Sequence, residues 1–212
     1  MAASEARNRA VIRAPRRPDH GRSGAVTVRL AELGEIDEVA SIFAPSLAPY
    51  RGHAGDWILA EYLAELVKVH DRAGVAETHV ALDEGRIVGS VAFYSDVALE
   101  GWSNLPGGWA GLRALAVHPA ARGRGAGRLL VERCLERARA VGALTLGLHT
   151  IDLLVDAVRL YQAMGFVRCP EFDLRAADVF GGPDDDPMVG RAFRYDLGAS
   201  GPRTVTEPGV TT

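Results

Sequence analysis

The chain has 212 residues, which is enough for one sizeable hydrophobic core and short for two, so we expect a single domain with tails. Hydrophobic residues make up 48% and charged residues 24%, a composition that excludes a wholly disordered chain. Lysine and arginine number 24 against 27 acidic residues, and this net charge of -3 disfavours a general nucleic-acid binder.

Membrane and disulfide classes are also disfavoured. No apolar run approaches the roughly 18–20 residues that a membrane helix needs, and the N-terminus lacks the apolar stretch of a signal peptide. The two cysteines, Cys134 and Cys169, are too few for a disulfide framework or a four-cysteine zinc site. We therefore expect a soluble protein of the reducing cytoplasm with no membrane partner.

Two terminal segments differ in composition from the rest. Residues 1–24 hold six arginines, several prolines and glycines and few large apolar side chains, which predicts a disordered basic tail. Residues 198–212 also read as a disordered tail, so the domain is expected over residues 25–197. Nucleic-acid binding by the basic arm is a distant alternative to a solvated tail.

Between the tails, the hydrophobic period switches repeatedly between that of a strand and that of a helix. It predicts, in chain order, a strand at 25–30, helices at 35–47 and from Asp56, a β-hairpin at 78–82 and 87–95, a loop at 101–108 and a strand at 112–117. It then predicts a helix at 125–141, a strand at 144–149, a helix at 153–164 ended by Gly165, and strands at 166–169 and 193–197. This order indicates an α/β fold with a mixed sheet and flanking helices.

The most informative stretch follows the strand at 112–117. His118-Pro119 ends that strand, and the run RGRGAG of residues 122–127 then opens an amphipathic helix. Glycines at a helix N-terminus leave backbone N–H groups uncovered, and the helix dipole adds positive charge, so a phosphate or pyrophosphate fits there. The alternative is a glycine-rich turn that binds no ligand.

Two common phosphate motifs do not match this turn. A dinucleotide-binding G-x-G-x-x-G fails because Arg128 stands where its last glycine belongs, and a Walker loop fails because no Gly-Lys-Ser/Thr follows. The side chains of Arg122, Arg124 and Arg128 add donors for an anion at this turn.

Two signatures together resemble one family. Arg122, Gly125 and Gly127 match the pattern Gln/Arg-x-x-Gly-x-Gly/Ala, and residues 157–166, AVRLYQAMGF, are similar to A-x-x-L-Y-x-x-x-G-F. With this spacing, the sequence resembles the GNAT superfamily of CoA-dependent N-acyltransferases over residues 26–197. The resemblance implies a mixed, largely antiparallel central sheet with a splayed parallel strand pair and flanking helices.

The resemblance also implies that acetyl-CoA binds between the two splayed strands, at 112–117 and 144–149. Pantetheine would pair with the first strand like an added strand. The residues implied for this contact are Leu115, Ala116 and Val117. The residues implied for the pyrophosphate are Arg122, Gly123, Arg124, Gly125, Ala126, Gly127 and Arg128.

Further roles follow from the same resemblance. A backbone N–H near Val117 would polarise the thioester carbonyl, and Tyr161 would protonate the departing CoA thiolate. Asp156 would contact the pantetheine amide. The alternatives are that Tyr161 is a core aromatic and that Asp156 is a solvated acid favoured by the helix dipole.

The general base is the point where the match is incomplete. An acidic residue often stands just before the apolar run of the fourth strand in the relatives, but this sequence has Gly111 there. His149, at the end of the fifth strand, is our candidate base, because imidazole titrates in a useful range. A structural histidine is the alternative. Further candidates are His118, Glu77, Tyr94, Asp96 and Asp173. No motif supports a metal or serine mechanism.

The acceptor pocket is expected between the first two helices, the loop at 101–108 and residues 169–186. Residues that could line it are Tyr50, Arg51, His53, Trp57, Trp102, Trp109 and Phe172. The acidic run 184–186 could attract a cationic amine, and a solvated loop is its alternative.

The sequence thus leads to an N-acetyltransferase that moves an acetyl group from acetyl-CoA to a primary amine by direct attack, without a metal. The amine would belong to a small molecule or a peptide, and a homodimer is possible. The main alternative is a non-catalytic acyl-CoA-binding module on the same fold, which Gly111 favours slightly.

Overall fold

The structure is a computed structural model that describes residues 25–52, 56–72 and 74–198. The predicted tails, apart from Gly198, lie outside the described residues, and so does His53. No helix within the described ranges is both long enough and apolar enough to cross a bilayer.

The described residues form eight strands and five α-helices, joined by turns and short 3-10 segments. The strands are β1 Thr27–Leu30, β2 Glu77–Asp83, β3 Arg86–Tyr94, β4 Ala110–Val117, β5 Thr145–Ile151, β6 Val167–Arg168, β7 Leu174–Arg175 and β8 Val189–Asp196. The helices are α1 Ile36–Leu47, α2 Asp56–Leu66, α3 Ala126–Ala140, α4 Val155–Ala163 and α5 Ala176–Phe180.

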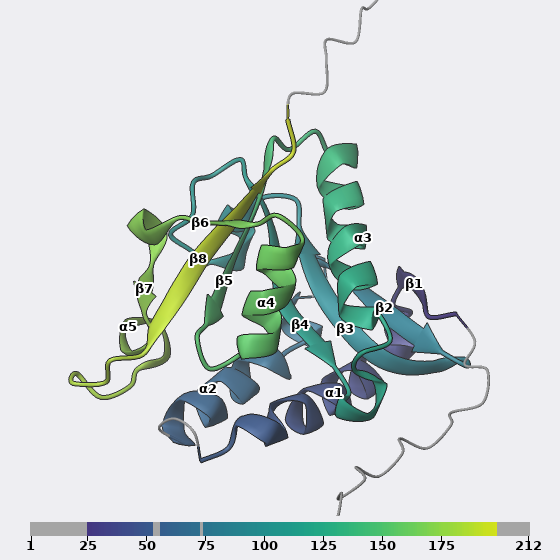
Figure 1. Ribbon diagram of the computed structural model, residues 1–212, viewed down its shortest axis with the longest axis horizontal. Coiled ribbons are helices and arrows are strands. Elements are labelled where there is room, and N and C mark those ends of the chain that lie inside the picture. The colour runs from purple at the N-terminus through teal and green to yellow at the C-terminus, as the bar shows by residue number, and fades with distance from the viewer. Residues whose placement is uncertain (1–24, 53–55, 73, 199–212) are drawn as a thin grey trace, which may run out of the picture.

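All eight strands belong to one sheet, in the order β1-β2-β3-β4-β5-β8-β6, with β7 paired to β8. Among these strands, β4 and β5 are the only neighbours that run parallel, and they pair only at Ala110–Leu146 and Gly111–Gly147. Beyond Gly111 the two strands separate, and Figure 1 shows them diverging toward α1 and α2. The predicted mixed, largely antiparallel sheet with one splayed parallel pair is therefore confirmed.

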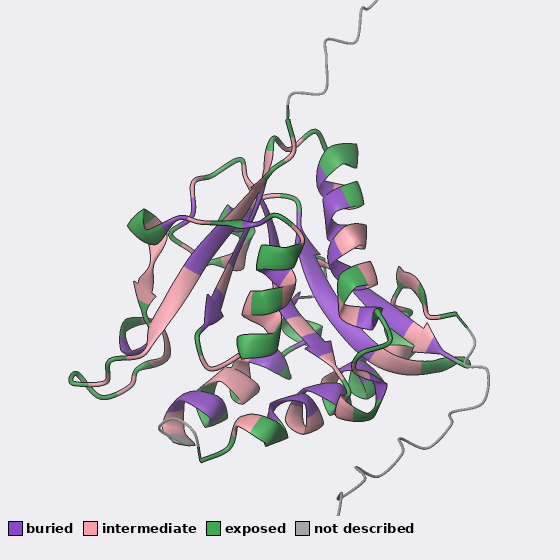
Figure 2. Ribbon diagram, in the orientation of Figure 1, coloured by how far each residue is buried: buried purple, intermediate pink, exposed green. Residues whose placement is uncertain are grey.

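The core has one layer on each face of this sheet because alternate strand residues point to opposite faces. Val91 and Phe93 of β3 pack with α3 and α4, whereas Ala92 and Tyr94 pack with α1 and α2. Figure 2 shows the buried surfaces of the strands and of α3 facing each other. The helices therefore hold the two diverging strands from opposite faces.

The predicted element order is correct up to β6, where the structure adds two elements. β7 has two residues and α5 has five, and both lie between β6 and β8. Such short elements carry no periodic hydrophobic pattern, which is why the sequence did not predict them. Gly165, with φ +93°, ends α4 in the left-handed conformation that was expected.

A bulge bends β4 at the point where it has left β5. The pairing with β3 shifts register between Ser90 and Ala92, and Ala114 has φ +56°. A non-glycine residue in this region costs roughly 1–2 kcal/mol. Strain of this kind is found at functional sites, where the surrounding structure maintains it.

Candidate functional site

A cavity of about 510 Å³ lies beside the end of β4 that has separated from β5. α1, α2, β4, the turn before α3, α3 and α4 all contribute to its wall. Ten of the eleven residues predicted to bind the cofactor line it, namely Leu115, Ala116, Val117, Arg122, Gly123, Gly125, Ala126, Gly127, Arg128 and Asp156. Arg124 is the one that does not.

The β4 side of the cavity presents an unpaired strand edge. Ala116 and Val117 pair with β3 on one edge, but β5 has already separated on the other. The backbone groups on the free edge can therefore hydrogen-bond an extended, amide-containing ligand, as an added strand would. Pantetheine has two amides in an extended chain, so it fits this edge.

The far end of the cavity is the glycine turn before α3. Gly123 and Gly125 have φ of +76° and +88°, which L side chains rarely adopt. A Cβ at either position would meet nothing within 4 Å, so conformation rather than crowding requires glycine. Gly125 is the N-cap of α3, and no side chain caps this helix end. Its first N–H groups are therefore free for an anion.

The three arginines of this segment have different partners. The Arg122 guanidinium donates to the Ser46 carbonyl at 2.7 Å and lies 3.8 Å from the Asp156 carboxylate, which ties the turn to α1 and α4. Arg128 lines the cavity and pairs with Glu132, one helical turn away, at 2.9 Å.

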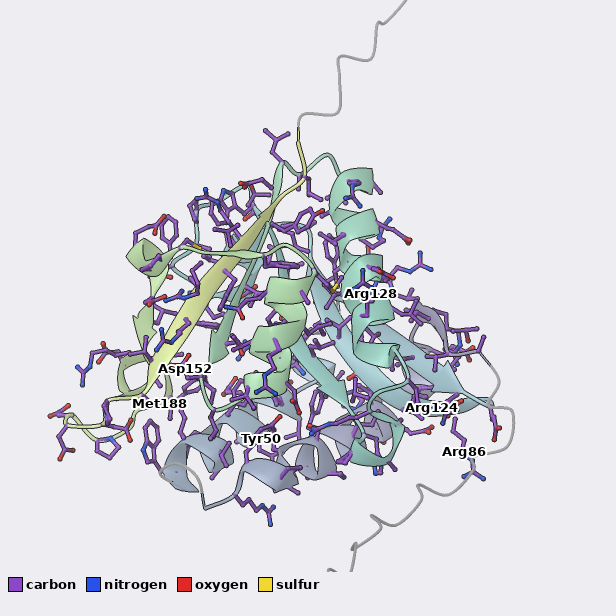
Figure 3. The ribbon with its side chains drawn as sticks, in the orientation of Figure 1. Tyr50, Arg86, Arg124, Arg128, Asp152 and Met188 are labelled. Atoms are coloured by element: carbon purple, nitrogen blue, oxygen red, sulfur yellow. The ribbon has the colours of Figure 1, made fainter. Side chains whose placement is uncertain are left out.

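Arg124 points away from the cavity, toward the β2–β3 hairpin. Its guanidinium donates to the Asp83 carboxylate at 2.8 Å, and Figure 3 shows it on the side of the hairpin end that carries Arg86. The sequence placed Arg124 with the phosphate-binding residues, because spacing alone does not reveal that Asp83 lies within reach.

Tyr161 lies in α4 but lines neither this cavity nor the second one described below. Its side chain is 4% exposed, and its ring centroid lies 5.5 Å from that of Phe166. Burial raises the pKa of its hydroxyl far above the usual range, so the group stays protonated. Ala157 and Leu160, which precede it on α4, do line the cavity.

A second, smaller cavity of about 40 Å³ adjoins the first. Tyr62 of α2 lines both. Side chains of six elements or loops surround it, among them Ile58, Trp102, Arg113, His149, Thr150, Leu174, Val179 and Phe180. The sequence singled out Trp102 and His149 in this set but missed Tyr62 and Arg113, which lie in apolar runs that read as core.

Three polar side chains converge on this second cavity. The Arg113 guanidinium lies 4.6 Å from the centre of the Trp102 ring, and the Trp102 and His149 rings are 5.4 Å apart. The His149 Nε2 lies 2.9 Å from the Phe172 carbonyl, and because a carbonyl only accepts, Nε2 is the protonated nitrogen. The Trp102 Nε1 and the His149 Nδ1 are buried without a partner among the described residues. Burial lowers the pKa of His149.

The other residues expected in the acceptor pocket lie elsewhere. Tyr50 lines the first cavity, and its hydroxyl is 3.5 Å from Asp156. Trp57 donates its indole N–H to Asp186 at 2.6 Å, which gives that member of the acidic run a structural role. Trp109 and Phe172 pack edge to face, and Arg51 lines neither cavity.

The further base candidates have structural partners. Arg137 donates to Glu77 at 2.6 Å, and Arg168 donates to Asp173 at 2.7 Å. Asp96 accepts from the backbone N–H groups of Ala98 and Gly108 at 2.9 and 3.1 Å. Tyr94 is core, and the Nδ1 of the exposed His118 accepts from the Ala120 N–H at 3.3 Å. Within the described ranges, no three His, Cys, Asp or Glu side chains are grouped as metal ligands would be.

Comparison with solved structures finds the same fold. A GNAT-family acetyltransferase from Staphylococcus aureus has a TM-score of 0.58 and 14% identity, covering 82% of this chain and all of that chain. The ribosomal-protein-S18-alanine N-acetyltransferase of Escherichia coli gives 0.57 and 17%, covering 84% of this chain and 97% of that one. The Salmonella typhimurium protein yncA, solved with acetyl-CoA, gives 0.56 and 19%, covering 84% and 98%.

Comparison with families finds one match over more than half of the chain. No curated protein matches the sequence. Residues 36–166 match the model of the acetyltransferase (GNAT) family, a range that contains both motifs on which the resemblance rested. That resemblance is confirmed, and the chain belongs to the acetyltransferase (GNAT) family of acyltransferases.

Proposed function

We propose that the protein transfers an acetyl group from acetyl-CoA to a primary amine by direct attack. The observation that carries this proposal is the adjacency of the two cavities, which share Tyr62. The larger one has a glycine turn for phosphates and a free strand edge for pantetheine, while the smaller one has polar side chains. The thioester would lie where the two cavities meet.

The proposed roles follow from this arrangement. Gly123, Gly125 and Arg128 hold the pyrophosphate, and a backbone N–H near Val117 polarises the carbonyl. Tyr161 protonates the departing thiolate: burial keeps its hydroxyl protonated, although the raised pKa also makes that hydroxyl a weaker acid. His149 and Trp102 bind the acceptor.

A non-catalytic acyl-CoA-binding module is the second candidate. The small volume of the second cavity, about 40 Å³, favours it, because most amines would need the walls to move. The burial of Tyr161 away from both cavity walls favours it too.

Release of free CoA thiol separates the two candidates. The purified protein is incubated with acetyl-CoA and a panel of small primary amines, polyamines and peptides with free N-termini. We expect amine-dependent thiol release with at least one class of acceptor. Binding of acetyl-CoA, seen as a raised melting temperature, without thiol release for any amine would favour the binding module. An unchanged melting temperature at saturating acetyl-CoA would contradict both.

A further inference from the structure

The space above Gly111, at the start of β4, is filled by a carboxyl group from another segment. A Cβ built on Gly111 would lie 2.5 Å from Oε1 of Glu100 and 3.0 Å from the Val97 side chain. Glu100 ends the 3-10 segment Val97–Glu100 that follows β3. Glycine at 111 therefore leaves room for a carboxylate that the preceding loop supplies.

Glu100 is a carboxyl group with no dedicated partner. Within the described residues it makes no hydrogen bond and no ion pair. Arg113, two residues beyond Gly111 on β4, is the charged group that acts on it, and Tyr94 of β3 is the other titratable neighbour. Burial outweighs Arg113 and raises the pKa of Glu100 to about 7.

Glu100 lines neither cavity itself, but two residues close to it line the proposed acceptor cavity. Trp102, two residues along the chain, and Arg113 both line that cavity, and the Arg113 guanidinium lies over the Trp102 ring. Glu65 of α2 faces the same guanidinium at 4.0 Å. The titratable groups around the site are thus Glu100, Glu65, Tyr94, Tyr62, His149, Arg113 and Arg72.

We propose that the Glu100 carboxylate is the general base that removes the proton from the acceptor ammonium. This inference rests on the proposed function. The ammonium gives one proton to Glu100, which passes it to solvent, and the nitrogen lone pair then attacks the thioester carbon. The C–N bond forms, the C–S bond breaks with its electron pair on sulfur, Tyr161 protonates the thiolate, and the second nitrogen proton restores the Tyr161 hydroxyl. The products are the amide, free CoA thiol and one released proton.

His149 is the rival base. Its Nδ1 is free to accept a proton, but burial lowers its pKa, whereas a base works best when its pKa lies near the working pH. His149 lines the second cavity, whereas Glu100 lies next to Arg113 of its wall, so variants of the two residues distinguish the two assignments.

The test compares steady-state kinetics of Glu100→Gln with those of wild type, using the acceptor found in the thiol-release assay. We expect kcat/KM to fall by about 10²-fold or more, with acetyl-CoA affinity unchanged within about twofold. Glu100→Asp keeps a carboxylate and should recover at least about a tenth of the lost activity. Glu65→Gln, which removes the other carboxylate facing Arg113, is the matched control and should keep about half of the activity or more.

The dependence of kcat/KM on pH separates a catalytic role of Glu100 from a structural one. Loss of a residue with a purely structural role would leave the shape of this profile unchanged. Because the base works only when ionised, wild-type kcat/KM should be lost as the pH falls through about 7. This fall of kcat/KM at low pH, the acid limb of the profile, should be absent in Glu100→Gln and present in His149→Gln. If Glu100→Gln does not fold, Gly111→Ala gives the same test, because its methyl displaces the carboxylate from its place.

The inference is overturned if Glu100→Gln keeps more than about a third of the activity, if its pH limb is unchanged, or if His149→Gln alone removes that limb. A wild-type protein that releases no thiol with any amine would contradict the proposed function itself.

Discussion

The two cavities that meet at Tyr62 are built in different ways. The larger one is walled mainly by β4, the glycine turn and α3, which follow one another between Leu115 and Arg128. The smaller one is walled by side chains from α2, β4, β5, β7, α5 and the loop before β4. One site is therefore built largely on one continuous segment, which α1, α2 and α4 complete, and the other exists only where distant segments converge.

This difference has a chemical consequence. A turn and a strand edge bind through backbone groups, which every sequence of the same conformation presents, so they suit an invariant ligand such as acetyl-CoA. Side chains from several elements set the shape and polarity of the proposed acceptor cavity, so we expect that replacing one of them changes the acceptor without changing the proposed donor site. The following variants test this division of roles.

Gly125→Glu should have the largest effect, because it destroys the local site. It places a side chain at φ +88° and a negative charge at the phosphate position. Wild type should gain about 2.7 kcal/mol of stability at 100 times the Kd of acetyl-CoA, a rise in melting temperature of roughly 5–10 °C, and the variant should gain none. Gly125→Ala has the same backbone strain without the charge and should keep part of the rise. A full rise in Gly125→Glu would remove the turn from the binding site.

Tyr161→Phe tests whether a buried residue beside the local site takes part in the chemistry. The ring and its contact with Phe166 are kept, and only the hydroxyl is lost. If Tyr161 is the acid, kcat should fall about 10²–10⁴-fold while melting temperature and acetyl-CoA affinity stay the same. Single-turnover measurements must show that chemistry limits the rate. A kcat within twofold of wild type would leave protonation of the thiolate to water.

Trp102→Leu should act on the second cavity alone. The change removes the ring beneath Arg113 and a buried indole N–H that has no partner among the described residues. A cation–π contact and one hydrogen bond together are worth roughly 1–2 kcal/mol, so we expect the KM of the acceptor to rise about tenfold. Acetyl-CoA should raise the melting temperature as in wild type. A weaker effect of acetyl-CoA would show that the cavities are not separable.

Arg128→Ala and Arg124→Ala should have the smallest effects on acetyl-CoA binding. The test is the difference between the Kd values of the two variants. Arg128 lines the first cavity, whereas Arg124 is paired with Asp83 outside it. One hydrogen bond from the exposed Arg128 to a phosphate is worth roughly 0.5–1.5 kcal/mol, so its loss should weaken acetyl-CoA binding about two- to tenfold. Arg124→Ala should change the Kd less than twofold. Calorimetry that gave the opposite order would place the phosphates on the hairpin side of the turn.

Sequence alone was sufficient for features that depend on neighbours in the chain. The alternating and helical periods predicted the order of elements up to β6, and proline and glycine at 118–127 predicted the strand end and the helix start. Positive φ at Gly123 and Gly125 is also a local property, since only glycine adopts it readily. The family resemblance rests on two such local motifs, and the first cavity contains ten of the eleven cofactor residues that the resemblance implied.

The tertiary structure decided which side chains meet. Asp83, 41 residues away in the chain, pairs with Arg124 outside the first cavity, Tyr62 lines both cavities, and Glu100 fills the space that Gly111 leaves. These contacts depend on the order of the strands in the sheet, on the register of β3 and β4 and on the path of the loop between them. No periodic pattern in the sequence predicts these features. Backbone conformation is fixed by local sterics and can be read along the chain, whereas contacts between distant side chains are fixed only when the whole sheet has assembled.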